Sequence, residues 1–479
     1  MKKAWGVALA FGLASAVACG GGGGPSGPVS PAPTPTPAPR ANVIVLTLDD
    51  MDSDSVAYMP KLLSLIADRG VNLVYAYATL PLCAPARATF FTGQYAHSHG
   101  VTSNEDYAEV RASGLEASNI ATWLKGAGYS TAMLGKYFNN YPSGSPETFI
   151  PQGWDEWLGV LEDRTVDNVD WEANDNGRIV SYRDTGQATY QTDVLADRAV
   201  DFIRRVTDRP IFVLIAPSSP HLPATPASRH EGMFAGYDAP RTPSFNEEDV
   251  SDKPFWLRTR PPINALLVRQ IDIDYRKRLE SLQSVDELIQ KVVDALQATG
   301  RLDNTYFIFT SDNGVMQGQH RLRGKHAPYE ESISVPLMIR GPRVAAGARR
   351  NHLVGHVDLN PTICEMAGIA IPSSVEGRSL MPLLGDAPPA PSAWRQELLI
   401  ELFGGGPNIP PYGAIRAERP DGGSYLYVEY DAGNDREFYD LRRDPDQLTN
   451  TYLGSDPSIV EPLRTRLQTL RTCRGSACR

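Results

Sequence analysis

From residue 42 onward, nearly continuous apolar runs alternate with stretches in which apolar residues recur at helical spacing. Residues 43–48 and 211–216 are apolar runs typical of strands that are buried on both faces of a sheet. Residues 192–206 and about 266–299 carry apolar positions on one helical face. Further elements are predicted as strands at 71–76, 131–134, 306–310 and 335–339, and as helices at 59–68 and 118–125, the last capped by Ser118. Strands that alternate with helices predict βαβ units and an α/β fold with a mostly parallel central sheet flanked by helices.

The pattern changes near Gly385, where Pro388, Pro389 and Pro391 cluster. Short strand-like segments follow, and the chain ends in a helical pattern. These elements are predicted at 397–403, 425–430 and 437–441 for the strands and 459–471 for the helix. They predict a small antiparallel sheet packed with one helix. We therefore expect a catalytic body over residues 41–385 and a C-terminal α+β subdomain over residues 386–479.

The N-terminus has the pattern of an export signal. Two lysines precede an apolar run over residues 5–17, which is shorter than the ~20 residues that span a bilayer. We predict a signal peptide over residues 1–18. Residues 15–19 resemble a bacterial lipoprotein signal, in which Cys19 would be lipidated, although Ala16 stands where leucine is preferred. Ordinary secretory cleavage near Ala18 is the alternative.

Residues 19–40 are rich in glycine and proline, so they predict an extended linker rather than a packed segment. Together with the signal, this linker predicts an exported protein, either a periplasmic or cell-surface lipoprotein or a secreted protein. Its only predicted contact with a membrane is a lipid anchor at Cys19.

Charge narrows the range of partners. The 479 residues include 46 basic and 56 acidic side chains, for a net charge of −10. A general nucleic-acid binder would show a basic face, so that class is excluded. A small anionic substrate is still allowed, since a pocket can be locally basic within an acidic protein.

The cysteines differ in their expected roles. Cys473 and Cys478 flank four residues in a chain predicted to be exported, so a small disulfide loop is expected, with two free thiols as the alternative. Cys364 lies in an apolar, helix-like stretch and is predicted to be core. Cys83 is left without an obvious partner.

Polar clusters follow three of the predicted strands. Asp49 and Asp50 follow the first strand, residues 311–314 follow the strand at 306–310, and His221 lies just beyond the strand at 211–216. In an open α/β sheet the active site lies at the carboxyl ends of the strands. Asp49, Asp50, Asp312 and Asn313 offer hard oxygen donors that suit Ca²⁺ or Mg²⁺. The alternative is that each acidic pair caps a helix or makes a turn.

A further candidate element, separate from these three clusters, surrounds Cys83. Pro85 suits the first turn of a helix that would continue through Phe91, which puts Cys83 at the helix N-terminus. Backbone N–H groups and the helix dipole favour an anion there. The alternative is a buried cysteine before an ordinary helix.

These motifs resemble those of a known family. Cys83-x-Pro85-x-Arg87, followed by Thr92-Gly93, resembles the signature of the type I sulfatases, and the upstream Asp-Asp and downstream Ser-Asp-Asn-Gly are similar in order and spacing. Residues 357–362 add to the resemblance, which extends from residue 42 to about 470. Two further segments, 135–137 and 325–330, are similar to the N-acetylglucosamine-6-sulfatase group. The family resemblance implies an alkaline-phosphatase-like fold.

The resemblance also implies a chemistry. A separate maturation enzyme would oxidise Cys83 to formylglycine, whose hydrate carries two hydroxyls. One hydroxyl attacks sulfur and releases the alcohol, and the second then loses its proton and expels sulfate. One divalent cation, Ca²⁺ in preference to Mg²⁺, would be held by Asp49, Asp50, Asp312, Asn313 and the modified Cys83.

The same resemblance implies roles for four more residues. Arg87 would hold and polarise the hydrated formylglycine, Lys136 and Lys325 would bind sulfate oxygens, and His221 would protonate the leaving oxygen. One departure from the family pattern concerns Phe138, which stands where many members have the histidine that acts as base in sulfate release. Candidates for that missing base are His97, His99, His320 and His326. The basic stretch 320–326 is either an ordinary charged loop or a source of positive charge at the mouth of the pocket.

The expected function is hydrolysis of sulfate esters, on a sulfated sugar or an aryl sulfate. One alternative is a phosphonate monoester or phosphodiester hydrolase, because those substrates also present a singly charged group. Another is a surface lipoprotein that binds sulfated glycans without turnover, which would follow if Cys83 stayed a thiol.

Overall fold

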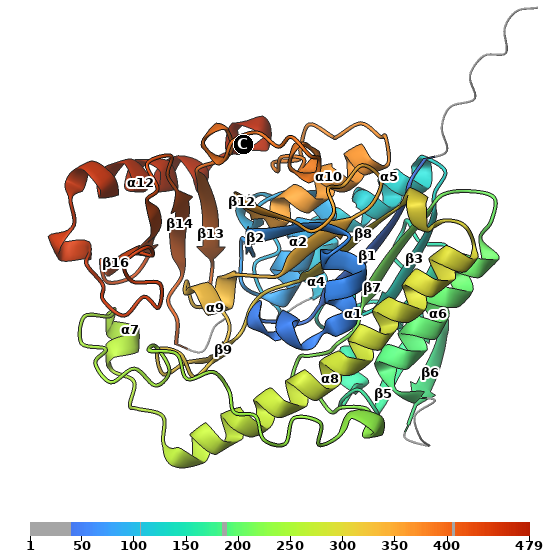
Figure 1. The fold of residues 1–479 in the computed structure, drawn as a ribbon, viewed down its shortest axis with the longest axis horizontal. Coiled ribbons are helices and arrows are strands. Elements are labelled where there is room, and N and C mark those ends of the chain that lie inside the picture. The colour runs from blue at the N-terminus through green and yellow to red at the C-terminus, as the bar shows by residue number, and fades with distance from the viewer. Residues whose placement is uncertain (1–39, 106, 184–188, 405–407) are drawn as a thin grey trace, which may run out of the picture. The chain divides into compact units, whose positions relative to one another are not determined.

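The computed structural model describes residues 40–105, 107–183, 189–404 and 408–479 (Figure 1). The predicted signal peptide, Cys19 and the linker up to residue 39 lie outside the described residues. None of the described helices combines the length and the apolar character that crossing a membrane requires.

A ten-stranded sheet forms the centre of the described body, in the order β12-β2-β11-β8-β1-β7-β3-β4-β5-β6. The pairs that β1 makes with β7 and β8, that β3 makes with β7 and β4, and that β2 makes with β12 are parallel. The remaining pairs, which involve β11, β5 and β6, are antiparallel. The strands are β1 (Asn42–Leu48), β2 (Gly70–Tyr77), β3 (Ser130–Gly135), β4 (Glu156–Val160), β5 (Trp171–Asp175), β6 (Arg178–Tyr182), β7 (Ile211–Ala216), β8 (Thr305–Ser311), β11 (Leu337–Arg340) and β12 (Ala348–Gly355).

Helices cover both faces of this sheet, and the alternation of side chains along β1 shows how. Val43 and Val45 pack into one core cluster, with residues of α2, α5 and α10, while Ile44 and Leu46 pack into the other, with residues of α1, α6 and α8. Figure 1 shows α8 and α6 side by side across the sheet. The helices are α1 (Pro60–Leu62), α2 (Cys83–Thr92), α3 (Ala96–His99), α4 (Tyr107–Ala112), α5 (Ile120–Gly126), α6 (Gln191–Arg205), α7 (Phe255–Arg258), α8 (Ala265–Ala298), α9 (Glu330–Ile333), α10 (Leu359–Met366) and α11 (Met381–Leu384).

A second, four-stranded antiparallel sheet follows in the C-terminal part of the chain. It comprises β13 (Glu397–Leu402), β14 (Tyr412–Glu418), β15 (Ser424–Tyr430) and β16 (Arg436–Asp440), and α12 (Pro457–Leu470) packs on it. Cys473 and Cys478 form the expected disulfide, and Cys364 is buried in the core. The domain boundary near Gly385 stays a prediction.

The predicted fold class is confirmed, and the local differences have physical reasons. The helix predicted at 59–68 starts at Pro60 and widens into a π-helical turn, Leu63–Ala67. Asn119 rather than Ser118 caps α5, because the Asn119 side chain accepts hydrogen bonds from the N–H groups of Ala121 and Thr122. The sequence patterns did not reveal β4, β5, β6, β12 or β14.

Candidate active site

Parallel pairing brings the two acidic motifs together. Asp49 and Asp50 directly follow β1, Asp312 and Asn313 directly follow β8, and these strands pair in parallel with Leu48 opposite Ser311. Both motifs therefore leave the sheet at the same edge. The backbone N–H of Asp50, a residue in the left-handed region (φ 61°), donates to Asp312 Oδ1 at 3.1 Å.

Cys83 completes a buried cluster at this edge. Each of Asp49, Asp50, Cys83 and Asp312 contributes one potential ligand atom, and these atoms all lie within 4.8 Å of one another. Cys83 is the first residue of α2, as expected, and its Sγ lies 3.4 Å from Asp49 Oδ1.

Asn313 adds an independent indication of a cation site. Its Nδ2 donates to Asp50 Oδ1 at 2.6 Å, whereas its Oδ1 is buried and has no hydrogen-bond partner among the described residues. A buried acceptor normally has a partner. Three carboxylates and an unpartnered amide oxygen therefore fit a hard divalent cation.

Three basic side chains form ion pairs with the carboxylates of the cluster. Lys136, which directly follows β3, places Nζ 2.7 Å from Asp49 Oδ2 and 2.7 Å from Glu162 Oε1. Lys325 donates to Cys83 Sγ at 2.7 Å and pairs with Asp50. Arg87 donates to the backbone carbonyl of Lys136 at 2.8 Å and pairs with Asp312.

Burial and these charges set the protonation of the cluster. Burial by itself would raise the pKa of Asp49, but the neighbouring side chains of Lys136, His221, Arg87 and Lys325 together outweigh it and hold that pKa well below its usual range. Burial, reinforced by Asp49, raises the pKa of Asp312. Burial and the Asp49 carboxylate also raise the pKa of the Cys83 thiol, so the unmodified side chain is a neutral thiol.

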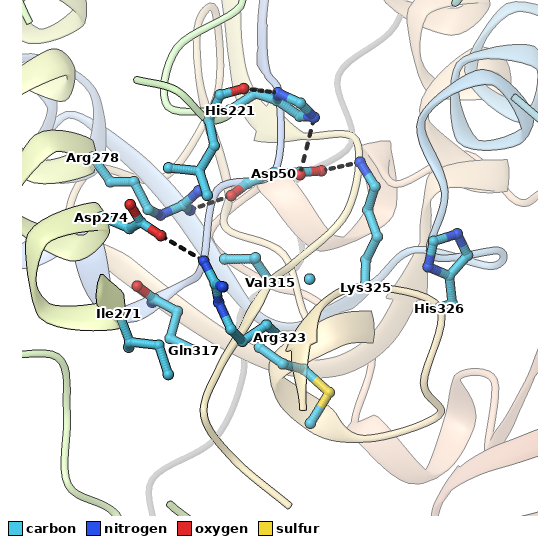
Figure 2. A pocket seen from close by; sticks show the side chains of 13 residues that line it. Asp50, His221, Ile271, Asp274, Arg278, Val315, Gln317, Arg323, Lys325 and His326 are labelled. Carbon is cyan, nitrogen blue, oxygen red and sulfur yellow. Dashed lines mark hydrogen bonds and ion pairs between the residues drawn. The ribbon is translucent and has the colours of Figure 1, made fainter. Parts of the chain in front are cut away.

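His221 lies at the mouth of the site. Its Nδ1–H donates to the Leu222 carbonyl at 2.7 Å, and its Nε2 faces Asp50 Oδ2 at 3.6 Å (Figure 2). The side chain is 42% exposed. The ring nitrogen that is not held by the backbone is thus directed toward the cluster and remains open to a substrate.

The four histidines considered as the missing base lie in different surroundings. His97 is held between Glu401 Oε1 and the Cys473 carbonyl, and His99 between Thr89 Oγ1 and the Val101 N–H. His320 is buried against Glu247, 2.6 Å from Oε2, where burial lowers its pKa to about 3. His326, by contrast, lines a cavity together with Asp50, His221 and Lys325.

Sequence reasoning missed three residues of this region. Glu162 pairs with Lys136, and nothing in its local sequence indicates that contact. The Arg278 guanidinium, from α8, donates to the carbonyl of Asp50 (Figure 2) and also to the carbonyl of Pro220. The sequence did contain an indication of this residue, because Arg278 is a charged residue on the apolar face of the helix predicted at 266–299. His356 shares a small cavity with Arg87 and Asp312, and burial lowers its pKa to about 4.

Two cavities open from the cluster on either side of His221 and Leu222, which line both. The first, of about 360 Å³, includes Asp50 and Lys325, and the second, of about 300 Å³, includes Asp49 and Glu162. Of the basic stretch at 320–326, residues 323–326 line the first cavity. Arg321 instead donates to backbone carbonyls of Glu247, Glu248 and Arg260, so that part of the stretch is structural.

Comparison with family models identifies matches over most of the chain. The model described as Sulfatase matches residues 41–369, and the model described as N-sulphoglucosamine sulphohydrolase, C-terminal, matches residues 318–473.

Individual proteins give the same result. The chain is 31% identical over 463 residues to the N-acetylglucosamine-6-sulfatase of Homo sapiens, a match that covers 88% of this chain and 82% of that protein. It is 35% identical over 363 residues to the extracellular sulfatase SULF-1 homolog of Drosophila melanogaster, which covers 74% of this chain. The match spans only 32% of that longer protein.

Among solved structures, the chain is similar to that of BT4656 in complex with its substrate D-glucosamine-2-N,6-O-disulfate. The TM-score is 0.75 at 23% identity, and the match covers 90% of this chain and 97% of that chain. At this identity the likeness establishes the fold, as predicted.

Proposed function

Since this chain belongs to the sulfatase family, we propose that it hydrolyses sulfate esters at the cluster around Cys83, releasing inorganic sulfate and an alcohol. One observation carries the proposal. The Cys83 side chain is buried in a cluster of three aspartates, which are ion-paired with two lysines and an arginine. A singly charged sulfate ester needs such positive charge, and a divalent cation needs such carboxylates.

The cation would be held by Asp49, Asp50, Asp312 and Asn313, together with the modified Cys83. Ca²⁺ is preferred over Mg²⁺, because Ca²⁺ accepts a shell made largely of protein oxygens whereas Mg²⁺ retains several waters. When bound, the cation would offset the charge on the sulfate oxygens and on the nucleophile.

The nucleophile would be formylglycine, made from Cys83 by a separate maturation enzyme. Its hydrate supplies two hydroxyls on one carbon, one to attack sulfur and one whose proton is lost when sulfate is released. The location of Cys83 Sγ, 2.7 Å from Lys325 Nζ and 3.4 Å from Asp49 Oδ1, supports this role for the modified side chain.

The other residues then have distinct tasks. Lys136 and Lys325 bind sulfate oxygens, and Arg87 is oriented toward the nucleophile by its bonds to Asp312 and to the Lys136 carbonyl. His221 donates a proton from Nε2 to the leaving oxygen, because its Nδ1–H is already held by Leu222. His326 is our candidate for the base that assists sulfate release, since it is the histidine beside Lys325 in the first cavity.

The substrate would be a sulfated sugar or an aryl sulfate. The human relative carries the name N-acetylglucosamine-6-sulfatase, so an amino sugar sulfated at O6 is the first substrate to test. The decisive measurement compares kcat/KM on matched aryl sulfate and aryl phosphodiester or phosphonate substrates. Preference for the sulfate supports the proposal, and preference for the phosphorus substrates would assign the chain to phosphoester hydrolysis instead.

Mass spectrometry of the peptide that contains Cys83 tests the nucleophile directly. Conversion of the CH₂SH side chain to CHO lowers the peptide mass, and we expect that species in active protein. A thiol in protein purified from its own host would favour a binding protein for sulfated glycans without turnover.

We also propose export with lipidation at Cys19, which would tether the catalytic body through the linker at residues 19–40. Acyl chains insert with about 0.8 kcal/mol per CH₂, and two or more chains make attachment stable. In membrane fractionation, Cys19→Ala should release the protein or leave its signal uncleaved. Soluble wild-type protein whose N-terminal peptide lacks lipid would establish simple secretion.

A further inference from the structure

Two short antiparallel strands, β9 (Met316–Gln317) and β10 (Arg323–Gly324), form a hairpin. The first cavity extends away from the cluster between α8 and this β9–β10 hairpin (Figure 2). The cavity is lined by Lys325 and Asp50, which belong to the cluster, and by Arg323 with its partner Asp274, which Figure 2 places on the opposite side of the view from Lys325. Its volume of about 360 Å³ falls in the range of roughly 300–1,000 Å³ that ligand sites occupy. An ester whose sulfate meets Lys325 would therefore extend its alcohol half toward Asp274 and Arg323.

Asp274 and Arg323 form a preassembled polar pair. Arg323 Nη2 lies 2.6 Å from Asp274 Oδ2, and Asp274 Oδ1 accepts from Gln270 Nε2 at 2.7 Å, one turn earlier on α8. The carboxylate is therefore fixed in direction from both oxygens. The Arg323 side chain is 37% exposed, so its planar group presents N–H donors to the cavity.

This pair matches the chemistry of a sugar hydroxyl. A hydroxyl both donates and accepts, so it can give its hydrogen to Asp274 Oδ2 while it, or its neighbour on the ring, accepts from Arg323. A carboxylate oxygen has two lone-pair positions, which allows Asp274 to keep Arg323 and bind a hydroxyl together. An unsubstituted aryl group offers neither a hydrogen-bond donor to Asp274 nor a hydrogen-bond acceptor to Arg323.

The rest of the wall suits the carbon face of a sugar ring. Ile271, Val315 and Met316 supply aliphatic surface, and the described lining contains no phenylalanine, tyrosine or tryptophan on which an aryl ring would stack. Arg278, Arg323 and Lys325 outnumber Asp50 and Asp274 in this cavity, which favours an anionic sugar.

The second cavity has the opposite character. Its lining includes the acidic side chains of Asp49, Glu162, Asp163 and Asp167, and among the described residues no lysine or arginine lines it. Such a wall repels a polyanionic sugar, so the alcohol half is directed to the first cavity.

From these observations we propose that Asp274 and Arg323 are the residues that recognise hydroxyls of the sugar ring bearing the sulfate. This inference rests on the proposed function, and it makes the chain selective for sugar sulfates over aryl sulfates. The competing explanation is structural. Arg323 lies two residues before Lys325, so its pair with Asp274 also fixes the hairpin that carries a sulfate-binding lysine.

Kinetics of the matured enzyme separate the two explanations. Wild type, Asp274→Asn and Arg323→Gln are assayed on N-acetylglucosamine 6-sulfate and on 4-nitrophenyl sulfate. We expect each substitution to lower the ratio of kcat/KM for the sugar to kcat/KM for the aryl ester by about ten- to a hundredfold, as for the loss of a hydrogen bond to a charged group. Lys291→Ala is the matched control, because Lys291 lies on the same helix as Asp274 and loses only an exposed ion pair with Asp197 of α6, and it should leave both rates unchanged.

If kcat/KM falls by the same factor on both substrates, the pair fixes the hairpin and the inference is overturned. The inference is also overturned if kcat/KM falls on neither substrate. If wild type hydrolyses neither sulfate, the proposed function fails, and binding then decides the inference by itself. Calorimetric titration of Cys83→Ala with N-acetylglucosamine 6-sulfate should give a Kd that Asp274→Asn weakens by a similar factor. A Kd that the second substitution leaves unchanged, or no binding at all, would overturn the inference.

Discussion

Arg87 donates two hydrogen bonds to a single oxygen of Asp312: Nε lies 3.0 Å and Nη2 2.8 Å from Oδ2. The other oxygen, Oδ1, accepts from the backbone N–H groups of Asp50 and Asn313. The carboxylate is thus held in one orientation by the arginine of the cysteine motif and by the backbone of two residues that we propose as cation ligands. This single side chain joins the end of β8, the end of β1 and the helix that starts at Cys83.

Asp312→Asn should therefore remove both cation and activity. The substitution keeps the shape but weakens a ligand, and we expect turnover to fall more than a hundredfold, since partners outside the ligand shell alone contribute about 10–100-fold. It also leaves the Arg87 charge poorly paired in a buried site, a change that costs about 3–5 kcal/mol of folding free energy. Metal content per mole, kcat and the free energy of unfolding measure the three effects. Asp303→Asn, on the exposed turn before β8, is the control, and retention of one equivalent of metal by Asp312→Asn would contradict the site.

Cys83→Ser should react once and stop. Serine has one hydroxyl, so it can attack sulfur and release the alcohol, but it has no second hydroxyl to expel sulfate. A stopped-flow trace should show a burst of alcohol equal to the enzyme concentration and then no further release. Cys83→Ala should show neither phase, with little change in stability, because only a small buried side chain is trimmed. Sustained turnover by the serine variant would rule out the two-hydroxyl mechanism.

Arg278→Lys should lower kcat by about 10–100-fold without removing any group that contacts sulfate. The guanidinium bridges the Asp50 and Pro220 carbonyls at once, and a lysine ammonium cannot reproduce that planar geometry. Both Asp50 and the loop that carries His221 would lose their orientation, so metal affinity should weaken together with kcat. Arg276→Lys, a change on the same helix that affects only contacts with the loop at Tyr237 and Asp238, should change neither metal affinity nor kcat. Unaltered metal affinity and kcat in Arg278→Lys would dismiss the positioning role.

The fold was predictable where burial is uniform. The strands β1, β7 and β8 are buried along their whole length, so their apolar runs identify them directly. The strands β5 and β6 lie at the edge of the sheet, where β6 alternates only weakly and carries exposed residues, and their pattern resembles a loop. All ten residues of α2 are buried, so this helix has no amphipathic stripe, and Pro85 was the only local indication of it.

The site was predictable to the extent that it is local in sequence. Asp49, Asp50, Asp312 and Asn313 follow buried strands, and parallel pairing brings such ends together. Glu162 and Asp274 reach the site through long-range packing, which no local motif records.

Stability should depend on pH through Glu331, which lies on α9. Burial, with the neighbouring carboxylates of Glu330 and Asp446, raises the pKa of Glu331 to about 7. In the unfolded chain a glutamate titrates near 4.3. Between these two values the folded protein binds the proton more tightly than the unfolded chain does. The free energy of unfolding is therefore highest below about pH 4 and falls as the pH rises from about 4 to about 7.

Glu331→Gln tests this because glutamine mimics the protonated acid at every pH. The raised pKa corresponds to a contribution of up to about 4 kcal/mol, lost between about pH 4 and 7. We therefore expect the variant to be only about 1 kcal/mol more stable than wild type at pH 5 and about 4 kcal/mol more stable at pH 8, with urea unfolding as the measurement. Burial also raises the pKa of Glu247 to about 7. Its titration changes the free energy of unfolding of wild type and variant equally, so it cancels in the difference between them. Glu365→Gln, an exposed change on α10, should leave the profile unaltered. A stability difference between Glu331→Gln and wild type that is equal at pH 5 and pH 8 would mean that Glu331 does not titrate in this range, and that its carboxylate is better solvated than its burial implies.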